Sequence, residues 1–205
     1  MIVDFLLGDL HFGNDGMFNR SYSKKFNTKE KYIKAVIKNY NSIVNEKHTV
    51  LFLGDLGKSE ILKEYIPKMK GRKILILGNH DKYSKKFYNE LFDEVYSGPV
   101  FISPRIVVSH EPIPVEKGVL TVHGHTHYVM LKSDQHINIC VEHTDYRPVS
   151  VKSIVGKLSN LEKPNRKFLH EWYKDIQIWI GDCRDDLVLD ENNIINVEET
   201  LKLKQ

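Results

Sequence analysis

Cysteine is scarce in this sequence, and long apolar runs are missing. The two cysteines among the 205 residues, Cys140 and Cys183, have a spacing typical neither of a disulfide framework nor of a zinc ribbon. A reducing, cytoplasmic setting is therefore the simpler expectation. No apolar run reaches the length of a membrane span. Residues 1–7 are interrupted by Asp4 and carry no basic leader, so they do not resemble a secretory signal, and we expect no membrane partner.

Charge of one sign is also weak. Lysine and arginine number 30 and aspartate and glutamate 27, which gives a formal net charge of +3. That excess is too small for composition to indicate nucleic-acid binding. Hydrophobic content of 41% and charged content of 28% are typical of a soluble globular protein. Partners must therefore be inferred from the candidate site.

Five short polar clusters stand out in the first two-thirds of the chain. They are Asp9-Leu10-His11, Gly54-Asp55, Gly78-Asn79-His80-Asp81, Ser109-His110 and Gly124-His125-Thr126-His127. Carboxylate and amide oxygens mixed with imidazoles are suitable ligands for borderline divalent ions such as Mn, Fe, Co, Ni or Zn. Each cluster alone is a weak signal, whereas the ordered set predicts a two-metal hydrolytic centre.

Each cluster comes at the end of a short apolar segment rich in branched residues. The segments are residues 2–7, 49–53, 73–77, 106–108 and 120–122. Such segments are typical of strands that are buried on both faces and deliver functional loops at one edge of a sheet. The sequence therefore predicts that the clusters meet.

Helical and further strand patterns lie between these segments. Helices are predicted over residues 28–44, with Thr28 as N-cap, and over 60–69, 82–92 and part of 146–157. Further strands are predicted at 95–102 and at 129–141, the latter around a polar turn at Ser133-Asp134. The alternation predicts an α/β fold with a second sheet packed on the first.

The chain length suits one domain. We assign residues 1–158 to that domain and residues 159–205 to a C-terminal extension packed on it. The boundary is the polar stretch that contains Pro164, and the extension carries aromatic residues suited to packing, namely Phe168, Trp172, Tyr173 and Trp179.

The first two clusters offer carboxylates and one imidazole. In an extended segment, alternating side chains would place Asp9 and His11 on the same side of the backbone, where both could bind one ion. Asp55 follows a run expected to be buried, where an unpaired carboxylate is costly and a metal would relieve the cost. The alternatives are a surface or capping role for the first pair and an N-cap role for Asp55.

The later clusters add an amide and several imidazoles. Gly78 permits a tight turn, Asn79 offers a neutral oxygen, and His80 can then face a substrate. His125 and His127, two apart in an extended loop, can point to the same side. A lone histidine at a strand end, such as His110, is more often hydrogen-bonded and structural, but three in this setting favour metal ligation. His123 matches no cluster pattern and is expected in the core or behind the ligands.

The ordered pattern D-x-H, G-D, G-N-H-[DE], H and G-H-x-H resembles the calcineurin-like metallophosphoesterase superfamily, over residues 1 to about 155. The stretches from Asp9 to Arg20 and from Tyr146 to Ser150 resemble its small bacterial and phage branch, although Asn14 stands where many relatives have histidine. The resemblance implies a four-layer αββα sandwich, two packed mixed sheets flanked by helices. It implies one ion held by Asp9, His11 and His127, a second held by Asn79, His110 and His125, and Asp55 as the bridge.

This resemblance also implies a reaction. Two ions lower the pKa of a water and clamp phosphate oxygens, so a metal-bound hydroxide would attack a small phosphodiester or phosphomonoester. His80 is the candidate general acid, and Asp81 would orient its imidazole. Mn is the ion most favoured in vitro, and Fe, Ni, Co or Zn are alternatives. If a phage encodes the chain, the expected location is the host cytoplasm.

Substrate choice is less well defined by the sequence. Arg20 could pair with a phosphate oxygen or could be a solvated charge, and nearby lysines favour an anionic substrate, possibly a nucleotide. The motif Asp-Arg-Gly of protein phosphatases is absent after Asp55. A nuclease is the enzymatic alternative, disfavoured by the acidic residues 182–191; a protein-binding scaffold is a further alternative, disfavoured by the presence of His80. We expect a monomer or homodimer.

Overall fold

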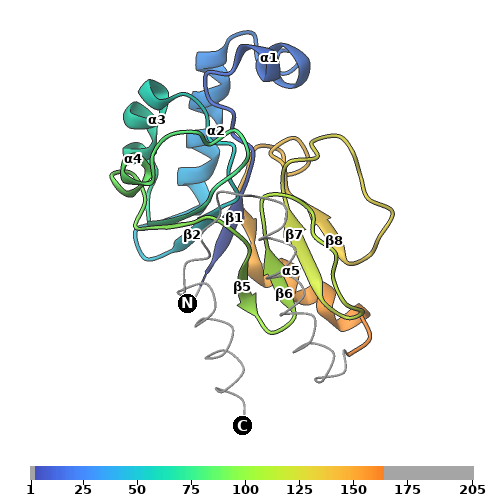
Figure 1. The fold of residues 1–205 in the computed structure, drawn as a ribbon. Helices are drawn as coiled ribbons and strands as arrows, with labels where there is room; N and C mark the ends of the chain where they lie inside the picture. Colours follow the sequence, from blue (N-terminus) through green and yellow to red (C-terminus); the bar gives the residue numbers. More distant parts are fainter. Residues whose placement is uncertain (1–2, 164–205) are drawn as a thin grey trace.

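Two β-sheets form the centre of the computed structural model, which describes residues 3–163 (Figure 1). The first sheet has the strand order β4-β3-β2-β1-β9. Its strands are β1 Phe5–Leu7, β2 Thr49–Phe52, β3 Arg72–Ile76, β4 Glu94–Tyr96 and β9 Val149–Ser150. Strands β1 to β4 are parallel, and β9 joins β1 in the antiparallel direction. The carboxyl ends of β1, β2 and β3 therefore lie at the same edge.

The second sheet has the order β5-β6-β7-β8. Its strands are β5 Val100–Ser103, β6 Ile106–Val108, β7 Leu120–His123 and β8 His136–Asn138. Strands β6, β7 and β8 are parallel, and β5 is antiparallel to β6. Both sheets are thus mixed, as predicted.

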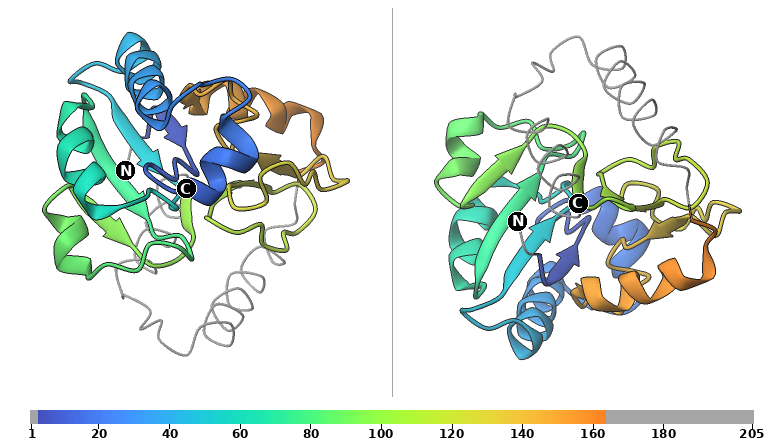
Figure 2. Two further views of the ribbon diagram at one scale, coloured as in Figure 1. Left: turned by 90° about the horizontal axis from the view of Figure 1, so that it is seen from above. Right: turned by 90° about the horizontal axis from the view of Figure 1, so that it is seen from below.

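Helices flank the pair of sheets (Figure 2). The helical segments are α1 Asp15–Met17, the π-helix η1 Phe18–Tyr22, α2 Lys29–Ile43, α3 Ser59–Tyr65, the 3₁₀ helix η2 Ile66–Lys68, α4 Lys85–Asn89, α5 Val151–Lys157 and the 3₁₀ helix η3 Leu158–Asn160. Thr28 caps α2, because its side chain accepts a hydrogen bond from the backbone N–H of Lys31. Helices α2, α3 and α4 lie against the first sheet, and α5 lies on the side of the second. The αββα architecture is confirmed.

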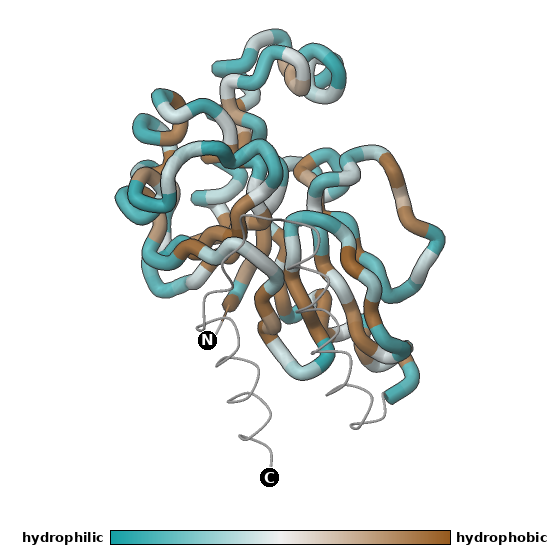
Figure 3. The backbone as a smooth tube through the Cα atoms, viewed as in Figure 1, coloured by the Kyte–Doolittle hydropathy of each residue, from teal (hydrophilic) through white to brown (hydrophobic). Residues whose placement is uncertain are grey.

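Two hydrophobic cores correspond to these layers. One joins the first sheet to helices α2 and α3 and includes Val36, Phe52 and Leu62. The other lies between the two sheets and includes Leu51 and Val108. Colouring by hydropathy shows the apolar strands in the interior (Figure 3). Because the central strands are covered on both sides, their carboxyl-end loops have fixed positions.

The five strands predicted before the polar clusters are confirmed as β1, β2, β3, β6 and β7. Two other predictions were wrong in part. Residues 95–102 form two strands in different sheets, because the chain crosses between the sheets at 97–99. Residues 129–141 form no hairpin: 136–138 form a strand beside β7, Cys140 makes an isolated bridge with Gly8, and 128–131 are exposed. The short helix predicted within 146–157 is confirmed as α5, which begins after a two-residue strand at 149–150.

Smaller differences concern the ends of the chain and of the helices. Helix α4 begins three residues later than predicted, since Ser84 caps it through the backbone N–H of Phe87. The first residues of the predicted extension contact the domain, because the Arg105 guanidinium donates to the carbonyl oxygens of Leu161 and Glu162. The rest of that extension, 164–205, lies outside the described residues.

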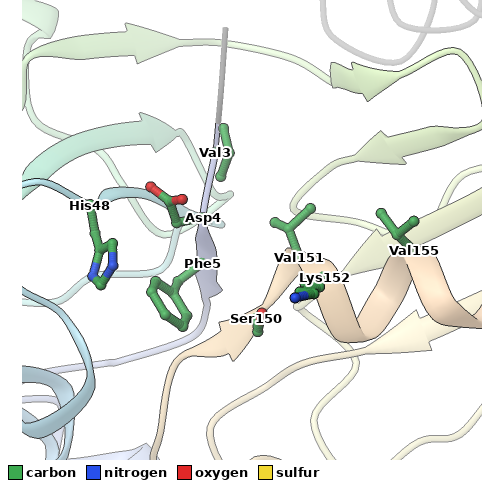
Figure 4. Close-up of a pocket in the computed structure, with 8 residues that line it drawn as sticks. All are labelled: Val3, Asp4, Phe5, His48, Ser150, Val151, Lys152 and Val155. Atoms are coloured by element: carbon green, nitrogen blue, oxygen red, sulfur yellow. The ribbon is translucent and has the colours of Figure 1, made fainter.

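A pocket of about 380 Å³ lies at the amino-terminal end of β1 (Figure 4). Its lining residues include Phe5, His48 and Lys152. This pocket is at the opposite end of the strand from the polar clusters. Within residues 3–163, no helix is both long and apolar enough to cross a bilayer.

Candidate metal centre

The structure brings the predicted ligands together at the carboxyl ends of β1, β2, β3, β6 and β7. The first group contains Asp9, His11 and His127. The His11 Nε2 atom lies 3.2 Å from His127 Nε2 and 3.3 Å from Asp55 Oδ2. Donor atoms of Asp9, His11 and Asp55 all lie within 4.8 Å of one another. Asp9, His11 and His127 are therefore close enough to bind a single ion, with Asp55 beside them.

The second group contains Asn79, His110 and His125. The Asn79 Oδ1 atom lies 2.9 Å from His110 Nε2 and 3.1 Å from His125 Nδ1. The two imidazole nitrogens are 3.2 Å apart. Donor atoms of Asp55, His110 and His125 again lie within 4.8 Å of one another. One amide oxygen and two nitrogens thus face a common point.

Asp55 lies between the two groups, and each group is nearest to a different oxygen of its carboxylate. Its Oδ2 faces His11 at 3.3 Å, and its Oδ1 faces His110 at 3.5 Å. Its side chain is only 2% exposed. The alternative N-cap role does not account for this arrangement, because Asp55 Oδ1 accepts from the backbone N–H of His80, 25 residues away.

The backbone at the ligand positions differs from the prediction. Asp9, His11, Asp55, His125 and His127 all have positive φ, between 45° and 63°. The extended geometry predicted for the D-x-H and H-x-H pairs was therefore wrong. Left-handed residues turn the chain sharply after each strand, and these turns direct both members of each pair into the site.

Two glycines allow the loops to pack against the carboxylates. A Cβ atom on Gly124 would lie 1.8 Å from Asp9 Oδ2. One on Gly78 would lie 2.4 Å from Asp55 Oδ1. Both distances are far below van der Waals contact, so only glycine fits at these places.

Hydroxyl groups hold the loop that follows β1. The Tyr22 hydroxyl donates to the carbonyl oxygen of Asp9, and the Tyr32 hydroxyl donates to that of Leu10. Both rings are buried and stacked 4.3 Å apart. The positions of Asp9 and His11 are therefore fixed by the core.

The electrostatics of the first group favour a bound cation. Burial raises the pKa of the Asp9 carboxyl to about 8, and burial lowers the pKa of His11 to about 4. The Asp9 Oδ2 atom is buried and has no hydrogen-bond partner among the described residues. Burial also lowers the pKa of His110. A neutral imidazole is the ligating form, and a cation would satisfy the orphaned carboxylate oxygen, so these residues fit divalent metal ions.

His80 and Asp81 have different surroundings from each other. The His80 side chain is exposed, and its ring lies edge-on to that of His11, with centroids 5.7 Å apart. The Asp81 carboxylate instead accepts from the backbone N–H groups of Gly78, Asp55 and Leu56 at 2.8–3.0 Å. Burial raises its pKa to about 6. The prediction that Asp81 orients the imidazole of His80 was wrong, because these amides engage its carboxylate and join the loops that carry Asp55 and Asn79.

One residue behind the ligands was missed by the sequence reasoning. The Glu142 Oε1 atom lies 2.7 Å from His127 Nδ1. Burial lowers the pKa of His127, whereas the hydrogen bond and the charge of Glu142 raise it, and the net shift is upward. Glu142 directly follows the apolar residues Ile139 and Val141, the same signal that identified Asp55. His123 is buried as expected, with its ring nitrogen bonded to the carbonyl oxygen of Gly124.

The π-helix η1 is connected to the loop after β7 by a hydrogen bond. Arg20 lies in η1 and is exposed. The neighbouring Ser21 carbonyl oxygen accepts a hydrogen bond from the Tyr128 hydroxyl, which connects η1 to the loop that carries His127. That loop then continues through an exposed apolar run at 128–131, seen in Figure 3.

Comparison with known proteins agrees with this geometry. A family model described as calcineurin-like phosphoesterase matches residues 5–195, so the chain belongs to that family. An uncharacterized protein of Methanocaldococcus jannaschii is 30% identical over 162 residues, which cover 74% of this chain and 88% of the relative. A crystal structure of a protein of unknown function from Aquifex aeolicus matches with a TM-score of 0.61 and 26% identity, covering 74% of this chain and 97% of that one. Family membership supports a hydrolase that acts on phosphoesters with divalent metal ions.

Proposed function

We propose that this protein hydrolyses a small phosphodiester or phosphomonoester with two divalent ions bound at the clusters described above. The observation that carries the proposal is the position of Asp55, whose two carboxylate oxygens face two separate ligand groups. Asp9, His11 and His127 would hold one ion, and Asn79, His110 and His125 the other. Ions bound there would activate water as the nucleophile and neutralise charge on the phosphoryl group.

His80 is proposed as the general acid. Its ring is exposed at the mouth of the site, next to His11 but not within the two ligand groups. An imidazole in this position can donate a proton to the leaving oxygen, while the ligands behind it stay in place. The backbone N–H of His80 donates to Asp55 Oδ1 at 2.9 Å. This bond ties the acid to the proposed bridging residue.

Arg20 is proposed to pair with a non-bridging phosphate oxygen. Its exposure leaves the guanidinium accessible, and the link from Ser21 to Tyr128 holds η1 beside the loop that carries His127. A guanidinium can bind a phosphate through two parallel hydrogen bonds. The mixed nitrogen and oxygen ligands suit Mn, Fe, Co, Ni or Zn, and Mn is the ion proposed for assays in vitro.

The proposal is tested by measuring hydrolysis of bis-p-nitrophenyl phosphate and p-nitrophenyl phosphate by metal-depleted protein. Each candidate ion is added in turn, and the number of bound ions is measured in parallel. We expect activity that needs added metal and saturates near two ions per chain. His136→Ala is the matched control, because His136 contacts Ser133 and the Ile113 carbonyl oxygen and none of the candidate ligands.

Three results would contradict the proposal in different ways. Binding of two ions without hydrolysis of either ester would favour a protein-binding scaffold. Cleavage of DNA or RNA with no turnover of small esters would favour a nuclease. Activity that survives complete metal removal would exclude the metal-dependent reaction.

A further inference from the structure

Glu142 is a buried carboxylate with a single polar contact among the described residues. Its side chain is 3% exposed. One carboxylate oxygen lies 2.7 Å from His127 Nδ1, and the other is buried and has no hydrogen-bond partner among residues 3–163. Burying a carboxylate with one oxygen unpaired is costly. The position of Glu142 therefore calls for a compensating role.

The contact is made on the side of His127 that faces away from the ligand group. His127 Nε2 lies 3.2 Å from His11 Nε2, so this nitrogen faces the proposed ion. Nδ1 faces Glu142. Because a carboxylate accepts but does not donate, a proton on Nδ1 is favoured, and the lone pair of Nε2 is left for the metal.

The backbone of His127 is held as well. The Asn138 side-chain amide donates to the His127 carbonyl oxygen at 2.8 Å, and the His143 ring contacts the same oxygen. These contacts fix the main chain of a residue whose φ is 45°. They leave the rotation of the imidazole to be set by Glu142.

The two ligand groups differ in this respect. In the second group, His110 Nδ1 is 2.7 Å from the carbonyl oxygen of Leu53, which is a neutral acceptor. In the first group the corresponding acceptor is the Glu142 carboxylate. An anionic acceptor raises the basicity of a ligating imidazole more than a carbonyl oxygen does.

We propose that Glu142 is a positioning residue for the ion bound by Asp9, His11 and His127. It selects the His127 tautomer, fixes the direction of the ring and strengthens binding at this site, with little effect on the second site. This inference is based on the proposed dinuclear function and adds a residue that lies outside the ligand motifs.

The test is calorimetric titration of metal-depleted protein with Mn²⁺. Glu142→Ala should weaken one of the two binding events by about 10–100-fold and leave the other unchanged. Glu142→Gln keeps an oxygen acceptor, so it should weaken the same event by less than about tenfold. Glu94→Ala is the control: this carboxylate is partly buried and pairs with Arg72, away from the site, so neither binding event should change.

A second measurement does not depend on activity or metal. At a pH above the raised pKa of His127, where its imidazole is neutral, the ¹⁵N chemical shifts in the metal-free protein report which ring nitrogen is protonated. We expect the Nδ1–H tautomer in the wild type and in Glu142→Gln, and a mixture of tautomers in Glu142→Ala. If Glu142→Ala loses metal because it folds poorly, the wild type and Glu142→Gln still report the tautomer of His127, because both keep an oxygen acceptor for Nδ1–H.

Several results would overturn the inference. In the calorimeter, two unchanged binding events in Glu142→Ala would do so, as would equal losses of affinity in Glu142→Ala and Glu142→Gln. In the NMR measurement, an Nε2–H tautomer of His127 in the wild type would do so. If the wild-type protein binds only one ion, and Glu142→Ala weakens that binding, the dinuclear proposal is contradicted but the role of Glu142 is supported. The two proposals are thus distinguishable.

Discussion

Replacing Gly124 by alanine is expected to damage the metal centre without changing a ligand. The added Cβ would lie 1.8 Å from Asp9 Oδ2 and 2.9 Å from Asp9 Cγ. Real Cβ contacts keep at least 3.0 Å, so the carboxylate or the loop must move by about 1.2 Å, the difference between these distances. Asp9 is fully buried and its backbone is held by Tyr22, so the displacement falls on the carboxylate within the candidate metal site or on the loop that carries Gly124.

The expected losses follow from this displacement. Overpacking of a buried site costs about 1–3 kcal/mol of unfolding free energy. A misplacement of about 1 Å in a catalytic arrangement can reduce the rate by about 10²-fold. We therefore expect Gly124→Ala to lose Mn²⁺ at one site and to lower turnover by about 10²-fold, with a modest loss of stability in the metal-free protein.

The matched control is Gly156→Ala. Gly156 lies in α5, and a Cβ there would meet nothing within 4 Å. This variant should keep both ions and gain about 0.5–1 kcal/mol in unfolding free energy. Metal content, urea unfolding and hydrolysis are compared across the two variants. Normal metal content and full activity in Gly124→Ala would refute the close packing of this glycine against Asp9.

The remaining predictions concern other parts of the site. Asp55→Asn should weaken both Mn²⁺ binding events in the calorimeter, because one carboxylate faces both ligand groups; a loss confined to one event would exclude a bridge. His80→Ala should keep both ions and lower turnover by about 10²–10⁴-fold for an alkyl ester but much less for a p-nitrophenyl ester, whose leaving group needs little protonation; equal losses on the two would show that His80 is not the acid. Burial lowers the pKa of His123 from 6.5 to about 4, so the unfolded chain binds a proton between these values that the folded protein excludes. The contribution of His123 to the unfolding free energy of the metal-free protein should therefore fall as pH drops from about 6.5 to 4, by up to about 3 kcal/mol. In urea titrations His123→Gln should show a shallower fall, and an unchanged slope would contradict the burial effect.

The positions of the candidate ligands along the chain could be predicted from the sequence because they obey a simple rule. Each follows an apolar segment, and parallel strands bring their carboxyl ends to one edge. This rule placed Asp9, Asp55, Asn79, His110 and His125 at one site, as the structure shows.

The local geometry could not be predicted in the same way. Periodicity describes extended strands and helices, whereas the ligand loops contain single left-handed residues that leave no repeating signal. For the same reason, Asp81 was assigned to the His80 ring, its neighbour in sequence. In the structure it bonds to the amide of Asp55, 26 residues away, a long-range contact that only the three-dimensional fold brings about.

The left-handed backbone at Asp9, His11, Asp55, His125 and His127 has a consequence for how this site can be lost or transferred. Such a conformation costs most side-chain-bearing residues about 1–2 kcal/mol; aspartate, asparagine and histidine adopt it more readily than other side chains, and glycine adopts it freely. Substitution of a candidate ligand by glycine would remove a proposed metal donor without straining the backbone, so the proposed activity can be lost without loss of the fold. Conversely, we expect that grafting the seven candidate ligands onto another scaffold would fail unless the turns after each strand were grafted with them.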